Sequence, residues 1–353
     1  MMAFEQRLSL LILKETRMKR LFKSVGKPLA IAGLAAAMGL SASIAQAMEI
    51  KISHQWKANV DGRDRAARIF VKEVEKADPS IKFRIYPAQS LGIKPVAQLD
   101  ALQNGTLEMA IFPMSYAVGK APEFSITIMP GTISNLDHAM RMRGTPFQKK
   151  LQELAHANGI HILSWWWTPG GFASKDREIA GPASVDGLKI RAADPTFEIM
   201  LKAAGASVVS MPSTEIYPSL QSGVLNATLT SAETFVSMRL YEQTKFATVG
   251  GNDLWMLMQP LVMSKKHWDA LTPAQKAIFE KAAAKSDEFF TGLQKEATKK
   301  MADAYIKAGA KVRELSDAEF ADWVALAKKT SWPAFEAKSP MAKELLTLIQ
   351  QVK

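Results

Sequence analysis

Cysteine is absent from the 353 residues of this chain, which excludes a disulfide framework, a thiolate nucleophile and zinc–thiolate sites. The familiar motifs of hydrolases, metalloproteases and nucleotide-binding enzymes are also missing from any suitable strand–turn–helix context. Histidine is scarce, and the five residues lie at no recognisable metal-ligand spacing: His54, His138, His156, His161 and His267. We therefore expect no metal and no cofactor. A Ser-His-Asp arrangement assembled only by the fold stays open.

Long apolar runs are lacking after residue 47, where no stretch of about 18 uninterrupted apolar residues occurs. Residues 18–47 begin with basic side chains, continue through an apolar run and end in Ala45-Gln46-Ala47. This pattern is typical of a cleaved secretory signal. We predict an N-terminal extension and signal peptide over 1–47, with the signal proper at 18–47, and a periplasmic mature chain that begins at Met48 or Glu49. A retained membrane anchor is the less favoured alternative.

Strong charge of one sign is lacking as well. The formal net charge of +11 falls to about +6 once residues 1–47, with seven basic and two acidic side chains, are set aside. The remaining lysines and arginines are scattered, and no basic run is longer than a pair. This distribution does not favour nucleic acid as a partner and suits a small anionic ligand.

The order of elements predicts an α/β protein with two lobes. Strand and helix patterns alternate as βαβαβ over residues 49–113, and a second βαβ block follows over 187–230. The words LQNGTLEMAIF and LQSGVLNATLT both place a glycine between a helix and a strand. We expect two similar lobes, each a mostly parallel sheet flanked by helices. Lobe 1 is predicted at 48–168 plus about 255–310, and lobe 2 at 169–254 plus part of 311–353.

The C-terminal third predicts a return crossing and a long helix. LWMLMQPLVMS at 254–264 has the character of a strand that crosses back between the lobes. Thr272, Pro273 and Gln275 form a capping-box pattern that begins a helix, whose periodicity continues to Ala308. A helix of that length, roughly 50 Å, would brace both lobes. Further helices beginning at Ser316 and ending at the C-terminus are expected to pack across both lobes.

Arg191 is the leading candidate for ligand binding. It lies at the carboxyl end of a predicted strand, directly before a helix that begins at Asp194-Pro195. The carboxyl ends of strands in open α/β sheets face the ligand crevice, and a guanidinium can bind a carboxylate through two hydrogen bonds. Position alone is equally consistent with a surface arginine paired to a neighbouring carboxylate.

Five sequence segments are similar to those of a known family: IYPAQSLG, LQNGTLEMA, DGLKIR, GASVVSMPSTEIYPSLQSGVLN and LTPAQK. They occur in order between about residues 50 and 280. In these segments the chain resembles the DctP-type extracytoplasmic solute receptors of TRAP (tripartite ATP-independent periplasmic) transporters. The resemblance implies a two-lobed periplasmic-binding-protein fold (type II-like). It also implies a non-enzymatic receptor that closes on an organic acid and delivers it to the TRAP membrane permease subunits. We expect a monomer, with a dimer as the alternative.

The resemblance also implies a set of ligand-binding residues. The arginine of the GLKIR word, here Arg191, holds the ligand carboxylate in this family. The pocket also draws on the loop after the first strand and on the strand after the second LQxG word. Together with the neighbouring positions, the candidates are Arg191, Trp167, Trp166, Gln55, Trp56, Thr230, Asn226, Ser213, Gly171 and Asp194.

Departures from the family pattern bear on the ligand. An ungapped reading places Gly171 where receptors for sialic-acid-like ligands carry a second arginine. Asn226 and Thr230 stand where the family usually has Asp and Asn, and Ser213-Thr214 replaces the usual Phe-Ser. These changes put a sialic-acid-like or strongly dicarboxylic ligand in doubt.

Three consecutive tryptophans, Trp165 to Trp167, precede the turn Thr168-Pro169-Gly170-Gly171. Alternation along a strand predicts that Trp165 and Trp167 point one way and Trp166 the other. Core packing explains at least one indole, and Trp167 is the first candidate to contact ligand.

We therefore predict a TRAP receptor for an aromatic or other ring-bearing monocarboxylate. A sugar acid such as a hexuronate, and an aliphatic oxo- or dicarboxylic acid, remain alternatives. A periplasmic hydrolase or isomerase on the same scaffold, and a binding protein for a sensor or an ABC importer, are the alternatives of other classes.

Overall fold

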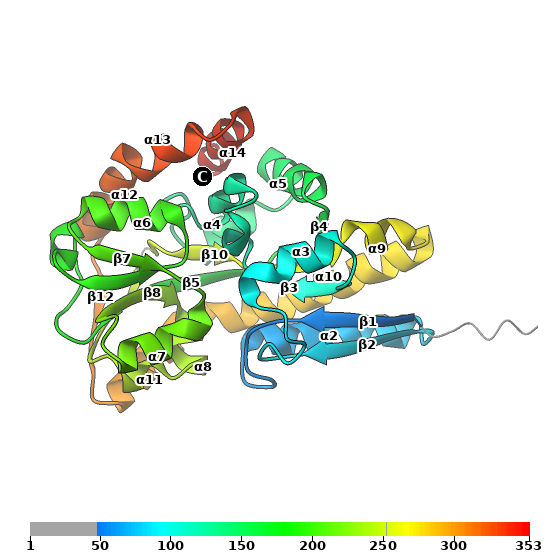
Figure 1. Ribbon diagram of the computed structural model, residues 1–353, viewed down its shortest axis with the longest axis horizontal. Coiled ribbons are helices and arrows are strands. Elements are labelled where there is room, and N and C mark those ends of the chain that lie inside the picture. Colours follow the sequence, from blue (N-terminus) through cyan, green and yellow to red (C-terminus); the bar gives the residue numbers. More distant parts are fainter. Residues whose placement is uncertain (1–47, 252) are drawn as a thin grey trace, which may run out of the picture. The chain divides into compact units, whose positions relative to one another are not determined.

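The computed structural model describes residues 48–251 and 253–353 (Figure 1). Within this region two β-sheets pack against helices and define two lobes. The predicted signal peptide at 1–47 lies outside the described residues. None of the described helices is long and apolar enough to cross a membrane.

Lobe 1 contains a five-stranded sheet in the order β2-β1-β3-β11-β4. Strands β1 and β2 pair in parallel, as do β1 and β3, which confirms the predicted βαβαβ unit. The strands are β1 (Met48–Ser53), β2 (Ile81–Tyr86), β3 (Met109–Ile111), β4 (Ile160–Ile162) and β11 (Leu261–Ser264).

Lobe 2 contains a seven-stranded sheet in the order β12-β9-β5-β8-β6-β7, with β10 paired to β5. Strand β6 pairs in parallel with both β7 and β8, so their carboxyl ends lie at one edge of the sheet. The strands are β5 (Trp167–Ser174), β6 (Lys189–Ala192), β7 (Ser207–Ser210), β8 (Ala227–Ser231), β9 (Phe246–Gly251), β10 (Met256–Met258) and β12 (Lys311–Leu315).

The chain crosses between the lobes at residues 163–166, between β4 and β5, and again at Gln259-Pro260, between β10 and β11. The predicted crossing strand at 254–264 is therefore confirmed as two short strands, one in each sheet. The strands next to the crossings, β5 and β11, run antiparallel to their neighbours. A strand that arrives without a crossover helix enters from the opposite end, so both sheets are mixed rather than purely parallel.

The two LQxG segments each need their glycine for the backbone conformation at the end of a helix. Helix α3 (Gln98–Gln103) and helix α7 (Ile216–Gln221) both end just before a glycine with a left-handed backbone. Gly105 has φ 71° and Gly223 has φ 78°, values that a residue with a Cβ rarely adopts. Each glycine turns the chain from the helix into a buried strand, β3 or β8.

The remaining helices of lobe 1 cover its sheet and build two apolar cores. Helix α2 packs along α10, and α5 packs on β4. These helices are α2 (Gly62–Ala77), α4 (Leu136–Arg141), α5 (Pro146–Ala157), α9 (Lys265–Ala270) and α10 (Pro273–Lys295). In lobe 2, α6 (Pro195–Ala203), α8 (Ala232–Ser237) and α11 (Ala297–Lys307) have the corresponding place.

The predicted long helix is two helices. Helix α10 begins with the predicted capping box of Thr272 and Gln275 and packs on α2 of lobe 1 (Figure 1). It ends at Lys295, because the Glu296 amide bonds to the Leu293 carbonyl, three residues back instead of four. Helix α11 then packs on α8 and β9 of lobe 2. The prediction of one continuous helix to Ala308 was wrong, although the segment does contact both lobes.

The C-terminal helices divide between the lobes. Helix α12 (Asp317–Lys329) begins with the predicted capping box of Ser316 and Glu319, and its Trp323 enters the lobe 2 core. Helix α13 (Ser331–Glu336) contacts α6, and α14 (Pro340–Gln350) packs on α5 with Leu345 and Leu346 in the lobe 1 core.

Candidate functional site

The carboxyl ends of strands from both lobes meet at one place. Gln55 follows β1 and Tyr116 follows β3 in lobe 1. In lobe 2, Arg191 is the last residue but one of β6, and Ser213 follows β7. These four residues, called here the interlobe cluster, are joined by hydrogen bonds across the lobes. Such edges are where open α/β folds bind ligands.

Ser213 is the contact point between the lobes. Its hydroxyl accepts a hydrogen bond from Gln55 Nε2 at 3.1 Å, and its amide donates to Tyr116 Oη at 2.9 Å. Gln55 and Ser213 are buried, and Gln55 Oε1 has no partner among the described residues. The cluster therefore keeps hydrogen-bonding capacity after the two lobes have satisfied each other.

Arg191 is buried, with 1% of its surface exposed. Its Nε and Nη2 donate to the Met211 carbonyl at 2.9 and 2.8 Å, Nη1 donates to the Leu229 carbonyl at 2.9 Å, and Nη2 also donates to Tyr116 Oη at 3.4 Å. A guanidinium has five N–H groups, so one Nη1 hydrogen remains. No carboxylate of the described residues forms an ion pair with Arg191 at 4.0 Å or less. Burial lowers its pKa from the ordinary value.

Asp194 has a local structural role beside Arg191. Its carboxylate caps α6 by accepting hydrogen bonds from the Thr196 and Phe197 amides at 3.1 and 3.2 Å, as the sequence pattern predicts. Burial raises the pKa of Asp194 to about 6, against the effect of hydrogen bonds from Thr196 and Ser125. A contact between Asp194 and ligand stays a prediction.

Strand β8 separates two of the predicted residues. Thr230 is buried near the carboxyl end of β8 and lies opposite Gly171 of β5. Asn226 precedes β8, at the other end of the strand, where it accepts from the Lys189 amide and donates to Asp176. Strand β8 has five residues, so roughly 13 to 17 Å separate Asn226 from the carboxyl end of β8. Arg191 is in register with Thr228, two residues after Asn226, but the hydrogen bonds of Asn226 go to Lys189 and Asp176 and not to the interlobe cluster.

Gly171 has no room for a side chain. A Cβ at this position would lie 2.2 Å from the Thr248 carbonyl oxygen of the neighbouring strand β9. A second arginine cannot stand here without displacing the backbone.

All three consecutive tryptophans are buried. Trp165 and Trp167 belong to one core and contact each other edge to face, while Trp166 belongs to the other core of lobe 1. The predicted alternation is confirmed. Trp165 donates to the Ala139 carbonyl and Trp166 stacks on Phe290, so packing accounts for both. The Trp167 indole N–H has no partner among the described residues.

Trp56 is part of the lobe 1 core, and its ring lies 4.1 Å below the guanidinium carbon of Arg63. Its neighbour His54 forms a buried contact with Asp64, Nε2 to Oδ1 at 3.0 Å. Burial alone would raise the pKa of Asp64, but hydrogen bonds from His54, Arg68 and the Asn59 amide lower it to about 2. These contacts tie this part of the loop to lobe 1, whereas Gln55 and Asp61 reach lobe 2 through hydrogen bonds with Ser213 and Ser237.

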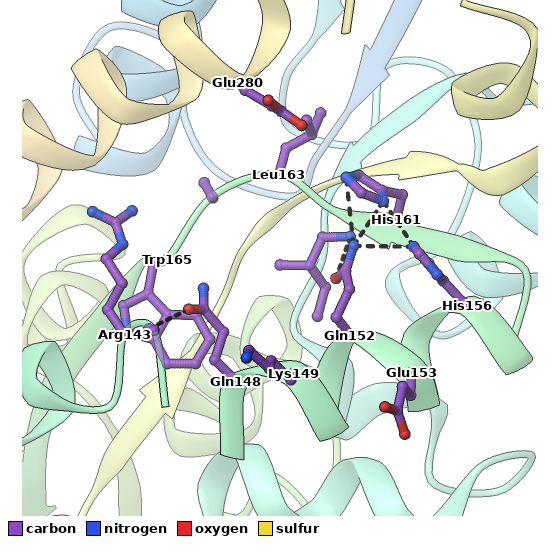
Figure 2. A pocket seen from close by; sticks show the side chains of 13 residues that line it. Arg143, Gln148, Lys149, Gln152, Glu153, His156, His161, Leu163, Trp165 and Glu280 are labelled. Carbon is purple, nitrogen blue, oxygen red and sulfur yellow. Dashed lines mark hydrogen bonds between the residues drawn. The ribbon is translucent and has the colours of Figure 1, made fainter. Parts of the chain in front are cut away.

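A cavity of about 590 Å³ lies elsewhere on lobe 1, between α5 and Glu280 of α10 (Figure 2). Gln152 connects His156 and His161 there, and His161 stacks on Trp268 at 3.9 Å. Burial, reinforced by the charge of His156, lowers the pKa of His161 to about 3. The described residues include no group of three or more His, Asp or Glu side chains that could hold a metal ion. His156 and His161 stack on each other, and the low pKa of His161 keeps it neutral at physiological pH.

Sequence reasoning missed Tyr116, although it follows β3 as Gln55 follows β1. The signal was weak, because Tyr116 and Arg191 are 75 residues apart and no sequence pattern pairs them. The position of Tyr116 just past the carboxyl end of a buried strand is the one clue that the sequence offered.

Comparison with known proteins places the chain in a family. Residues 52–338 match the model of DctP, the bacterial extracellular solute-binding proteins of family 7. A solute-binding protein of Albidiferax ferrireducens is 38% identical over 340 residues, covering 94% of this chain and 98% of the relative. The C4-dicarboxylate-binding periplasmic protein DctP of Rhodobacter capsulatus is 26% identical over 296 residues, covering 82% and 88%.

A solved structure agrees with these relatives. The crystal structure of a TRAP periplasmic solute-binding protein from Rhodoferax ferrireducens, with bound malonate, is 38% identical. It has a TM-score of 0.84 and covers 86% of this chain and 98% of its own. This chain belongs to the DctP family and is an extracytoplasmic solute receptor of the TRAP type. Its relatives are binding proteins rather than enzymes.

Proposed function

We propose that this receptor binds a small organic acid by one carboxylate at Arg191 and passes it to a TRAP permease. The observation that carries the proposal is the buried Arg191 guanidinium, which has no carboxylate partner among the described residues and retains one Nη1 hydrogen. Asp194 and Glu215 act on Arg191 electrostatically, but neither forms an ion pair with it. A buried cation without a directly bonded carboxylate is costly, and a ligand carboxylate would accept the remaining hydrogen.

A single anchoring cation favours a single anchored carboxylate. Arg63 and Arg191 are the fully buried arginines of the described region, and Asp61 already holds Arg63 through two hydrogen bonds of 2.7 Å. Gly171 leaves no room for a further arginine. Gln55 Oε1 is a buried polar atom of the interlobe cluster without a partner among the described residues, and it could accept a hydrogen bond from the rest of the ligand. Other predicted site residues with an unpartnered buried polar atom are Asp194, Trp56, Trp166 and Trp167.

The part of the ligand beyond its carboxylate could be aromatic or aliphatic. The aromatic preference predicted from the sequence is based on the missing second arginine and on the tryptophans at 165–167. The three indoles are buried, and packing accounts for two of them. A relative at 38% identity holds malonate, which supports a short aliphatic acid as the second candidate. Export through cleavage near Met48 remains part of the proposal, in line with the periplasmic relatives.

A thermal-shift panel tests the proposal. Purified protein is melted with benzoate, cinnamate, pyruvate, malonate, succinate and glucuronate. We expect at least one acid to raise the Tm by roughly 5 °C at a hundredfold excess over Kd. Aromatic acids should lead if the ring-bearing prediction holds, and malonate or pyruvate if the short-acid alternative does. A panel in which no acid shifts the Tm contradicts the proposal.

Tyr116→Phe tests the interlobe cluster. The variant removes the hydroxyl that accepts from the Ser213 amide and from Arg191. Since that hydroxyl joins the lobes, we expect about a fivefold loss of affinity for the best acid of the panel, near 1 kcal/mol. Tyr217→Phe is the matched control, because the Tyr217 hydroxyl donates to Glu242 within lobe 2. Equal affinities in the two variants, measured by calorimetry, would remove Tyr116 from the site.

A further inference from the structure

A second junction joins the lobes at the N-terminus of α2. Glu233 of lobe 2 lies against Gly62 of lobe 1, and its Oε1 accepts from the Gly62 amide at 2.8 Å. Its Oε2 accepts from Gln294 of α10 at 3.4 Å. We call Asp61, Gly62, Arg63 and Glu233 the interlobe latch.

Arg63 ties the latch to both lobes. It donates to Asp61 through Nε and Nη2, both at 2.7 Å, and to Gln259 at 2.6 Å. Weaker contacts reach Ser231 at 3.5 Å and Thr234 at 3.2 Å in lobe 2. Gln259 is a crossing residue, so the latch lies beside the segment about which the lobes would move.

Gly62 lets the carboxylate of the opposite lobe approach closely. A Cβ at this position would lie 3.3 Å from Glu233 Oε1 and 3.2 Å from Leu293 Cδ1. Both are tighter than ordinary contacts. The Gly62 N–H is also one of the first amides of α2, which have no partner within the helix. The carboxylate of lobe 2 therefore contacts a helix end of lobe 1 directly.

Two carboxylates share this helix end. Burial raises the pKa of Glu233 above its ordinary value, and the charge of Asp61 raises it further. Arg63 and the hydrogen bonds from Gly62 and Gln294 act in the opposite direction. Asp61 and Arg63, both at the start of α2, are the charged groups with the largest effect on Glu233, and α10 contributes the neutral Gln294.

We infer that Glu233 is a proton-linked latch, which takes up a proton when the lobes close over the ligand and releases it when they open. The inference rests on the proposed function, because only a receptor whose lobes separate would expose Glu233 and bury it again. Opening removes Gly62, Asp61 and Arg63 from the carboxylate and returns it to water. In the closed arrangement burial and Asp61 outweigh Arg63 and the hydrogen bonds, so the pKa of Glu233 is higher there than in water. The arrangement with the higher pKa binds more protons, so falling pH favours the closed lobes and rising pH favours the open lobes.

The test measures the distance between the lobes without ligand. The chain has no cysteine, so Lys72→Cys on α2 and Ala203→Cys on α6, both exposed, can be spin-labelled without competing thiols. Distance distributions are recorded by double electron–electron resonance between pH 5 and pH 8. In the parent we expect the closed population to increase as the pH falls. Glu233→Gln, which resembles the protonated acid, should lose at least half of that pH response.

Further variants separate the outcomes. Glu288→Gln on the exposed side of α10 is the matched control and should respond as the parent does. If Glu233→Gln does not fold, Gln294→Met keeps the inference testable, since loss of a hydrogen bond to the ionised carboxylate should move the midpoint to higher pH. The inference is contradicted if the distance distribution of the parent does not change with pH. It is also contradicted if Glu233→Gln shows the same pH response as the parent. If an acid of the panel still closes the lobes, the proposed receptor function survives that failure.

Discussion

Arg191→Met is expected to lower the affinity for the best organic acid by more than roughly tenfold, because a charged hydrogen bond and the anchoring cation are lost together. Methionine keeps much of the apolar volume but cannot donate to a carboxylate. The ligand-free variant should remain folded but lose some stability, since no ion pair is broken but the Met211 and Leu229 carbonyls lose the hydrogen bonds from Arg191. Isothermal titration calorimetry on the parent and the variant measures the difference.

Two further substitutions make this result specific. Arg191→Lys retains the charge but cannot reproduce the donations to Met211, Leu229 and Tyr116, so we expect an intermediate loss. Arg84→Met removes an exposed arginine of β2 and should leave the affinity unchanged. Affinity that is unchanged in Arg191→Met would disprove the role of Arg191 as anchor.

Gly170→Ala is expected to have the largest effect on stability, about 3 kcal/mol of lost unfolding free energy. A Cβ at Gly170 would lie 2.2 Å from the Thr230 carbonyl oxygen and 2.4 Å from Trp255 Cδ1. Both contacts lie inside the lobe 2 sheet, where β5 pairs with β8 and β10. The backbone oxygen cannot rotate away, so the strands must separate.

Gly292→Ala is the matched control for this prediction. Gly292 is exposed on α10 and nothing lies within 4 Å of a Cβ built there. Alanine should therefore stabilise the helix by about 0.5–1 kcal/mol. Urea denaturation followed by circular dichroism measures both variants. A Gly170→Ala protein as stable as the parent would contradict the close approach of these strands.

Local sequence patterns predicted much of the fold. The βαβαβ order, the capping boxes at Thr272 and Ser316, and the cap of α6 at Asp194 are all confirmed. The alternation of the tryptophans is confirmed too. Each of these features depends on residues within a few positions of one another, where periodicity and capping chemistry act.

Contacts between distant segments could not be predicted in the same way. The Tyr116–Ser213 hydrogen bond spans 97 residues, and the Gly62–Glu233 hydrogen bond spans 171. Asn226 shows the related difficulty of strand register, because it precedes β8 and bonds to Lys189 at the start of β6, two residues before the position that pairs with Arg191. The end of the long helix at Lys295 depends on one backbone hydrogen bond for which no glycine or proline gave a signal.

A crystal structure with the best acid of the panel tests the central claim most directly. We expect a ligand carboxylate oxygen within hydrogen-bond distance of Arg191 Nη1, with Gln55, Tyr116 and Ser213 around it. A ligand bound elsewhere, for example in the lobe 1 cavity beside His161, with Arg191 unchanged, would contradict it.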